Sequence, residues 1–333
     1  MTLSATRTDQ EQLQQIHDEV LRRQRFLLTS HLKPDGDSIG SQMAMAYALR
    51  ALGKDVRVVN CDPAPSALQT FPGVSEIEIA DHVEGDYDAV IVMECSDLAR
   101  TGVSGLERYF IVNVDHHPGN AMYGAVNWHD AGAAACGEMV FDVIGCLGVP
   151  LTREIATHIY VAILTDTGSF HHSGISPRTF DICRQTLEAG IDPVAIARSV
   201  FDTNNIGRLR LFGAVLGSVE IDASGRLAAI CLNRAMARAS GGTYDDTEGL
   251  INVPLTVKEI QVVVFFKEWE PNEYRVSLRS KGSIDVGGVA KQFGGGGHKN
   301  ASGCTVLGSL PDVRQQVMPL VEAAIERATQ TQG

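Results

Sequence analysis

The sequence predicts an α/β protein with a parallel sheet in its N-terminal half and a smaller α/β domain in its C-terminal half. Short apolar runs in the first half lack polar alternation, which is typical of strands buried on both faces of a parallel sheet. Amphipathic segments separate or follow these runs, as parallel connections require. At 333 residues the chain is long enough for two domains. The predicted strands are 25–31, 55–60, 88–95 and 109–115, and the predicted helices are 38–53, 137–148 and 152–168.

The pattern changes in the second half of the chain. Residues 185–214 are typical of helices and a connector, and strand-like runs follow at 226–233, 260–269 and 273–280. A glycine-rich segment and a closing helix over 312–330 complete the chain. We therefore expect a first domain over 1–190, a helical linker over 191–214 and a second domain over 215–333.

Composition and charge exclude several classes of protein. The formal net charge of −12 argues against a groove that follows a long nucleic acid, because such a groove needs many cations. No apolar run approaches the roughly 20 residues that span a bilayer, and the polar N-terminus does not resemble a signal peptide. The seven cysteines form no CxxC pair, which is typical of reduced thiols. We expect a cytoplasmic protein without a membrane partner.

Ionisable side chains follow the first predicted strand. His31, Asp35 and Asp37 lie within seven residues of one another, at the entrance to a predicted helix. One interpretation is a turn in which Asp37 or Ser38 caps that helix. The other interpretation is a ligand site, and the segments that follow bear on the choice.

The same pattern recurs at the ends of three later segments. Burying ionisable groups there costs free energy unless they are paired or bind a metal ion. The carboxyl ends of parallel strands meet at one edge of the sheet, where such proteins bind ligands. We therefore expect a common site that includes Glu94, Asp115, His116, His117 and Asp166.

The residue types indicate divalent cations. Carboxylates and imidazoles without thiolates suit manganese, magnesium, iron or zinc. So many ligands exceed the needs of one ion and fit two ions about 4 Å apart. Such a pair activates a bridging water for attack on phosphorus and takes up charge on the phosphoryl oxygens.

Four motifs, in this order, resemble those of the DHH phosphoesterases with a DHH-associated C-terminal domain. The match covers about residues 25–305, and the NrnA-type members are the most similar. The resemblance implies two domains facing each other across an active-site cleft, and hydrolysis of very short oligoribonucleotides (nanoRNA) or of 3′-phosphoadenosine 5′-phosphate (pAp). The motifs are HLKPDGDSIGS, VDHHPGN, ILTDTGSF and SLRSKGSIDVGGVAKQFGGGGHKNASGC.

The resemblance also implies roles for the site residues. By resemblance, two divalent cations, Mn²⁺ by expectation although Mg²⁺ or others would fit, would share Glu94 as a bridging ligand. His117 would lie beside the scissile phosphate, and Asp115 would orient the histidines. The remaining ligands implied are His31 and Asp35 for one ion and Asp37, His116 and Asp166 for the other.

Glu94 departs from the family, which usually has aspartate at this position. Glutamate keeps the charge and reaches one methylene further, so it can still bridge. Asp97 is the alternative ligand, or it caps the following segment. The substitution leaves open a changed metal preference or a lower activity.

The glycine-rich segment 293–303 is interpreted either as a flexible linker or as an anion-binding nest of backbone N–H groups. By resemblance, it would bind the phosphate end of the substrate together with Arg279, whose guanidinium grips phosphate bidentately. Ser277 and Lys281 are weaker candidates, and His171 and His172 are either surface histidines or substrate contacts. The segment's candidate binding residues are Gly294, Gly295, Gly296, Gly297, His298 and Asn300.

With the resemblance, these observations predict a manganese-dependent hydrolase that releases mononucleotides from nanoRNA, with conversion of pAp to AMP as a second activity. Its partners would be short oligonucleotides or nucleotides, and the protein could form a homodimer. One alternative is a phosphodiesterase for linear or cyclic dinucleotides. Another is a nucleotide-binding sensor whose catalysis Glu94 has weakened.

Overall fold

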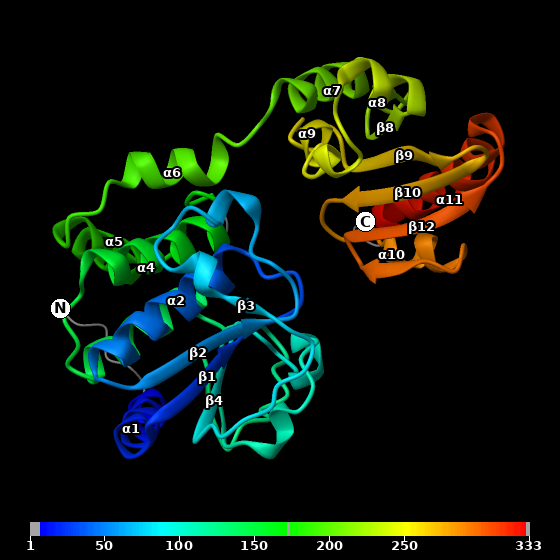
Figure 1. Ribbon diagram of the computed structural model, residues 1–333. Helices are drawn as coiled ribbons and strands as arrows, with labels where there is room; N and C mark the ends of the chain where they lie inside the picture. Colours follow the sequence, from blue (N-terminus) through cyan, green and yellow to red (C-terminus); the bar gives the residue numbers. More distant parts are fainter. Residues whose placement is uncertain (1–6, 172–173, 331–333) are drawn as a thin grey trace. The chain divides into compact units, whose positions relative to one another are not determined.

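The structure is a computed structural model that describes residues 7–171 and 174–330 (Figure 1). The chain divides into two compact units, residues 1–203 and 204–333. In the described part of the chain, no helix is long and apolar enough to cross a membrane.

The N-terminal unit is built on a six-stranded sheet in the order β3-β2-β1-β4-β5-β6. Every pairing in it is parallel, as the sequence predicts. Two edge strands escape the prediction because one has only two residues and the other only four. The strands are β1 (Arg25–Thr29), β2 (Asp55–Asn60), β3 (Glu78–Ile79), β4 (Ala89–Met93), β5 (Ile111–Asp115) and β6 (Val126–His129).

Different structures cover the two faces of this sheet. Helices pack on the face that carries Phe26, Ile91 and Val114, where they form the larger core. Loops with short 3₁₀ turns cover the face that carries Leu27 and Val90, rather than the helices that the sequence favours there. The helices of this unit are α1 (Arg7–Arg22), α2 (Gly36–Ala51), α3 (Cys136–Cys146), α4 (Arg153–Asp166), α5 (Pro177–Glu188) and α6 (Pro193–Phe201).

Helices α2, α3 and α4 approach one another closely through glycines. A Cβ added at Gly40 would lie 2.5 Å from the carbonyl oxygen of His158 and 2.9 Å from the Cβ of Ala162. A Cβ added at Gly137 would lie 2.5 Å from the same Ala162 Cβ. These contacts fix the separation of three helices that each carry or hold a predicted site residue.

The C-terminal unit is built on a second six-stranded sheet, in the order β11-β12-β10-β9-β8-β7. Only β8 and β9 pair in parallel; the other neighbours are antiparallel. Its strands are β7 (Glu220–Ile221), β8 (Leu227–Leu232), β9 (Val262–Glu270), β10 (Glu273–Ser280), β11 (Gly296–His298) and β12 (Ala301–Leu307).

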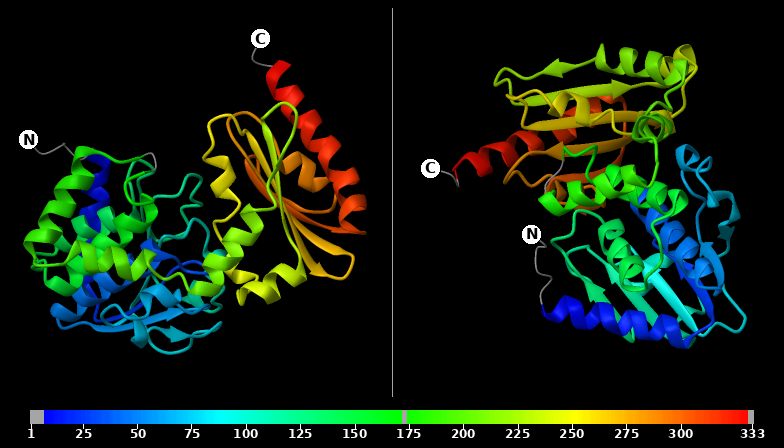
Figure 2. Two further views of the ribbon diagram at one scale, coloured as in Figure 1. Left: turned by 90° about the horizontal axis from the view of Figure 1, so that it is seen from above. Right: turned by 90° about the vertical axis from the view of Figure 1, so that its left-hand side faces the viewer.

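Helices cover both faces of this second sheet. α11 (Leu310–Gln330), which Figure 2 shows lying along the sheet, and α10 (Gly287–Lys291) pack on the face of Phe266 and Leu278. α7 (Ile206–Leu216), α8 (Arg234–Ser240) and α9 (Asn252–Leu255) pack on the opposite face, over β8 and β9. This leaves residues on that face of β10 and β11, such as Arg275 and His298, exposed.

Candidate metal centre

Glu94 directly follows β4, where the buried strand ends. Its side chain is 1% exposed, and its φ of 56° lies in the left-handed region that is uncommon for residues other than glycine. The backbone N–H of Glu94 donates to the carbonyl of Val114 on β5, which continues the pairing of the two strands. The strand ends therefore bring Glu94 next to His116, as the parallel sheet predicts.

His116 lies among three carboxylates. Its Nε2 is 3.2 Å from Glu94 Oε1, 3.5 Å from Asp166 Oδ2 and 3.7 Å from Asp37 Oδ2. Its Nδ1 lies 3.0 Å from the carbonyl oxygen of Ala133, so that nitrogen carries the proton and Nε2 faces the carboxylates. Burial lowers the pKa of His116, but the hydrogen bond to Glu94 and the charges of Glu94 and Asp37 outweigh it and raise the pKa to about 10.

Asp37 is fully buried in the first turn of α2 and is held from two sides. The backbone N–H groups of Cys136 and Gly137, at the start of α3, donate to its carboxylate at 2.6 and 2.9 Å, and the Ser41 hydroxyl donates at 2.9 Å. The N-terminus of α3 thus stabilises the negative charge. Burial, with the nearby charge of Glu94, still raises the pKa of Asp37 well above its ordinary value.

Asp166 is the last residue of α4 and completes this group. Burial raises the pKa of its carboxyl group. One ligand atom from each of Asp37, Glu94, His116 and Asp166 lies within 4.8 Å of every other, and the same holds for Glu94, His116 and His117. The structure therefore gathers residues from four segments that the sequence expected in one site.

His31 and Asp35 lie outside these two groups. Asp35 is the N-cap of α2 and accepts the Ser38 backbone N–H at 3.0 Å; the cap is thus Asp35, not Asp37 or Ser38. The Nδ1 of His31 is 2.7 Å from the Leu32 carbonyl oxygen, and its Nε2 is 3.8 Å from Asp35 Oδ2. The His31 and His117 ring centroids are 6.4 Å apart, so this pair borders the group on the His117 side.

Asp115 holds His117 in place. Its Oδ1 is 2.9 Å from His117 Nδ1, and its Oδ2 accepts the Asn120 amide at 2.6 Å. Burial raises the pKa of Asp115, but the hydrogen bonds from His117 and Asn120 hold it below its ordinary value. The hydrogen bond to Asp115 in turn raises the pKa of His117. Asp97, by contrast, accepts the backbone N–H of Ala99 and caps a 3₁₀ turn.

The donor set fits divalent cations. Three carboxylates converge on one imidazole, an excess of negative charge that a cation would neutralise. Glu94 Oε2 is buried and, among the described residues, has no hydrogen-bond partner. A buried carboxylate oxygen without a donor is costly, and metal coordination would satisfy it.

The predicted substrate residues lie on the C-terminal unit. Arg279 and Ala301 are register partners on β10 and β12, and Ala301 in turn pairs with His298 on β11. Arg279 and His298 therefore share one face of the sheet. The Asn300 amide instead donates to Ser280 Oγ and to the carbonyls of Gly282 and Ile284, so it holds the chain together after β10.

The glycine segment is more ordered than a linker or an open nest. The N–H groups of Gly294 and Gly295 donate to the carbonyls of Lys291 and Ala290 and so terminate α10. Gly296 and Gly297 begin β11 and pair with β12. An anion at this segment could therefore bind only backbone N–H groups other than those of Gly294 and Gly295. Of the two further histidines considered, His171 donates its N–H to Thr167, and His172 lies outside the described residues.

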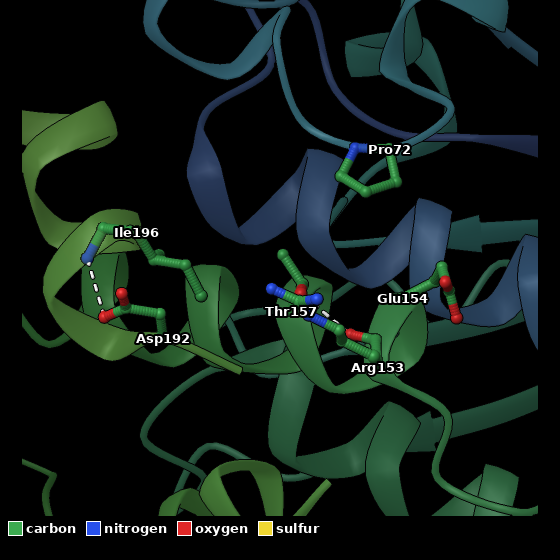
Figure 3. Close-up of a pocket in the computed structure, with 7 residues that line it drawn as sticks. Pro72, Arg153, Glu154, Thr157, Asp192 and Ile196 are labelled. Carbon is green, nitrogen blue, oxygen red and sulfur yellow. Dashed lines mark hydrogen bonds between the residues drawn. The ribbon is translucent and has the colours of Figure 1, made fainter. Parts of the chain in front are cut away.

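A separate cavity of about 300 Å³ lies at the other end of α4. Arg153, Glu154 and Thr157 from the start of that helix line it, together with Pro72 and Asp192 (Figure 3). Asp166 lies thirteen residues after Arg153 on α4, a distance of about 20 Å at the helical rise. This cavity contains none of the predicted site residues and does not belong to the metal centre.

Sequence reasoning missed the groups that hold the ligands. The Cys136 and Gly137 amides, the Ala133 carbonyl and the Asn120 amide each position one site side chain. Only Asn120 carried a signal, because PGN after the two histidines is a turn sequence.

Comparison with known families assigns both units. The model of the DHH family, N-terminal domain, matches residues 25–163, and the DHHA1 domain matches residues 232–328. The chain is 32% identical over 303 residues to the bifunctional oligoribonuclease and PAP phosphatase NrnA of Thermus thermophilus, covering 90% of each chain. It is 29% identical to the Streptococcus mutans protein named "probable bifunctional oligoribonuclease and PAP phosphatase NrnA", covering 89% of this chain and 95% of the other.

A solved structure agrees over almost the full length. The crystal structure of an exopolyphosphatase-related protein from Bacteroides fragilis superimposes with a TM-score of 0.85 at 26% identity. The match covers 97% of this chain and 98% of that one.

Proposed function

Since this chain belongs to the DHH family of phosphoesterases and is a hydrolase acting on phosphoester bonds, we propose that it degrades very short oligoribonucleotides to mononucleotides and also converts pAp to AMP. The observation that carries the proposal is the convergence of Asp37, Glu94, His116 and Asp166 within 4.8 Å. The names of the curated relatives supply the substrate class.

We assign two divalent cations, Mn²⁺ by preference, to this centre. Asp37, Glu94, His116 and Asp166 would hold one, and His31, Asp35 and Glu94 the other. When bound, such ions would supply a water of lowered pKa and would take up charge on the phosphoryl oxygens. The orphan Oε2 of Glu94 supports its role as the shared ligand.

His117 is proposed to protonate the leaving oxygen. Asp115 occupies its Nδ1, so Nε2 is the ring nitrogen that remains for the substrate. The hydrogen bond to Asp115 and the negative charge of Asp115 raise the pKa of His117 and so favour the protonated imidazole that this role requires. The Asn120 amide fixes Asp115 and thereby the ring.

Arg279 and His298 are proposed to bind the terminal phosphate of the substrate, with the glycine segment as the adjoining wall. Their shared face on the C-terminal sheet supports this, because a guanidinium and an imidazole two strands apart can grip one phosphate. A small number of phosphate-binding side chains on an acidic protein favours short substrates over long nucleic acid.

The test is hydrolysis of 5′-labelled RNAs of graded length. With Mn²⁺ we expect rapid cleavage of dimers to tetramers, slow cleavage of long strands, and loss of activity on chelation. Asp166→Asn serves as the inactive control. Cleavage of long RNA as fast as of dimers, or activity that survives the chelator, would refute the proposal.

Assays on the same protein preparation distinguish two alternative functions. A dinucleotide phosphodiesterase would cleave pApA or cyclic di-AMP much faster than pAp. The backbone of Glu94, at a φ of 56°, lies in a region that aspartate adopts more readily, so the fold should accept Glu94→Asp as a test of the sensor alternative. Binding of pAp without release of phosphate, together with turnover restored by Glu94→Asp, would identify a sensor.

A further inference from the structure

One face of the C-terminal sheet carries three cations. Lys267 on β9 and Arg275 on β10 are direct register partners, and Arg279 follows four residues along β10. Like charges placed opposite each other across two strands destabilise a sheet. The arrangement therefore calls for an explanation other than folding, in a protein whose net charge is −12.

No carboxylate pairs directly with these cations. Within the described residues, none of Lys267, Arg275 and Arg279 forms an ion pair with a carboxylate or donates a hydrogen bond to one; Arg279 donates to the carbonyl of Leu278. Burial, then the charges of Arg275 and Arg279, lower the pKa of Lys267, and the charge of Asp245 offsets this only in part. An anion would relieve both the repulsion and the missing partner.

Aromatic rings hold two of these cations in place. The Arg275 guanidinium carbon lies 3.3 Å from the centroid of the Trp269 ring, and Tyr244 packs edge-on against that ring at 5.2 Å. The Lys267 ammonium lies 5.3 Å from the Phe265 ring centroid. A stacked guanidinium loses little further freedom on gripping a phosphate. The surface is thus pre-organised.

Lys267 and Arg279 both line a pocket of about 420 Å³, and Arg275 lies outside its lining. Tyr244, Phe265 and Ser277 also line it, together with two carboxylates, Asp245 and Glu248. This volume falls in the range of small-molecule sites and would accept a nucleoside. Four residues of strand separate Arg275 from Arg279, about 13 Å along the backbone. Lys267 and Arg279 would therefore contact phosphates on either side of one nucleoside in the pocket, with Arg275 beside Lys267.

We propose that Lys267 and Arg275 form a second phosphate subsite, so that the C-terminal unit binds a nucleoside flanked by two phosphates. Its ligand would be the 5′-phosphorylated end of a short oligonucleotide. This proposal takes its substrate from the proposed function, whereas the arrangement of the cations is observed independently of that function. A purely structural stacking of Arg275 on Trp269 does not explain the second cation opposite it.

The test is calorimetric binding to the full chain in a chelating buffer, where no turnover occurs. The probes are 5′-phosphorylated triadenylate and 5′-AMP, which has one phosphate. Lys267→Met is expected to weaken triadenylate binding about tenfold, and AMP binding by a smaller factor. The slope of log affinity against log salt should fall by about 0.7. Lys258→Met, which removes an exposed lysine away from this pocket, is the matched control.

Each result decides the question. Equal losses for the two probes, no loss in Lys267→Met, or the same loss in Lys258→Met would overturn the subsite. Lys267→Arg should retain binding, and Arg275→Gln should reproduce the Lys267→Met loss. Because like-charge repulsion is removed, the melting temperature of Lys267→Met should not fall. Wild-type binding of triadenylate in this buffer, with no hydrolysis when Mn²⁺ is supplied in a separate assay, would refute the proposed function and leave the subsite intact.

Discussion

Gly40→Ala tests whether close helix packing sets the metal centre. The added Cβ would lie 2.5 Å from the His158 carbonyl oxygen, whereas ordinary contact begins at about 3.4 Å. Helices α2 and α4 must therefore separate by about 0.9 Å. α2 carries Asp37 and α4 carries Asp166, so two ligands would move apart in a site whose atoms lie within 4.8 Å.

The expected cost follows from two opposing effects. Alanine in place of glycine within a helix gains about 1 kcal/mol. Overpacking costs about 1–3 kcal/mol, and the upper end applies because the obstacle is backbone. We expect a net loss of about 2 kcal/mol in the free energy of unfolding. Metal affinity should fall about tenfold or more, because sites tolerate only about 0.2 Å of error in ligand distances.

The assay is urea unfolding followed by the fluorescence of Trp128, in a Trp269→Phe background so that only the N-terminal unit reports. Mn²⁺ affinity is measured by titration calorimetry. Gly145→Ala is the control, because nothing lies within 4 Å of its added Cβ and the variant should gain about 0.5–1 kcal/mol. Unchanged stability and metal affinity in Gly40→Ala, or equal losses in both variants, would refute the reasoning.

Three further predictions concern other parts of the molecule. Asp166→Asn and His116→Ala should each lower phosphoester hydrolysis at least 100-fold while the circular dichroism spectrum stays unchanged, because these groups serve the site and not the core; unfolded variants would contradict this. Burial lowers the pKa of His158 to about 4 in the folded protein. As the pH falls from 6.5 towards 4, His158 therefore becomes protonated in the unfolded chain but stays neutral in the folded one, which favours unfolding. Unfolding free energies should drop by up to about 3 kcal/mol over that interval, and His158→Gln should flatten the dependence. Asn300→Ala should destabilise the C-terminal unit by about 1–2 kcal/mol in thermal melts; a changed KM at unchanged stability would instead make Asn300 a ligand residue.

Elements with a strong local pattern could be predicted from the sequence. The buried parallel strands around Leu28, Ile91 and Val114 could be recognised because their side chains are apolar on both faces of the sheet. The helices beside them show the helical spacing of apolar residues. The edge strand Val126–His129 could not be recognised, because it has only four residues and its partner is set by the sheet. The same limit applies to Gly296–His298, where a glycine run gives no strand signal until β12 pairs with it.

The sequence by itself determined the fold class and the chemistry of the site: carboxylates and imidazoles at the ends of parallel strands, which the sheet must bring to one edge. Only the tertiary structure decided how each side chain is held. Asp37 depends on amide donors about 100 residues away at the start of α3, and Asp35 became a helix cap beside His31. Strand and helix patterns report on near neighbours along the chain, whereas these hydrogen bonds of Asp37 join distant segments. The like-charge pair of Lys267 and Arg275 depends on the register of the hairpin formed by β9 and β10.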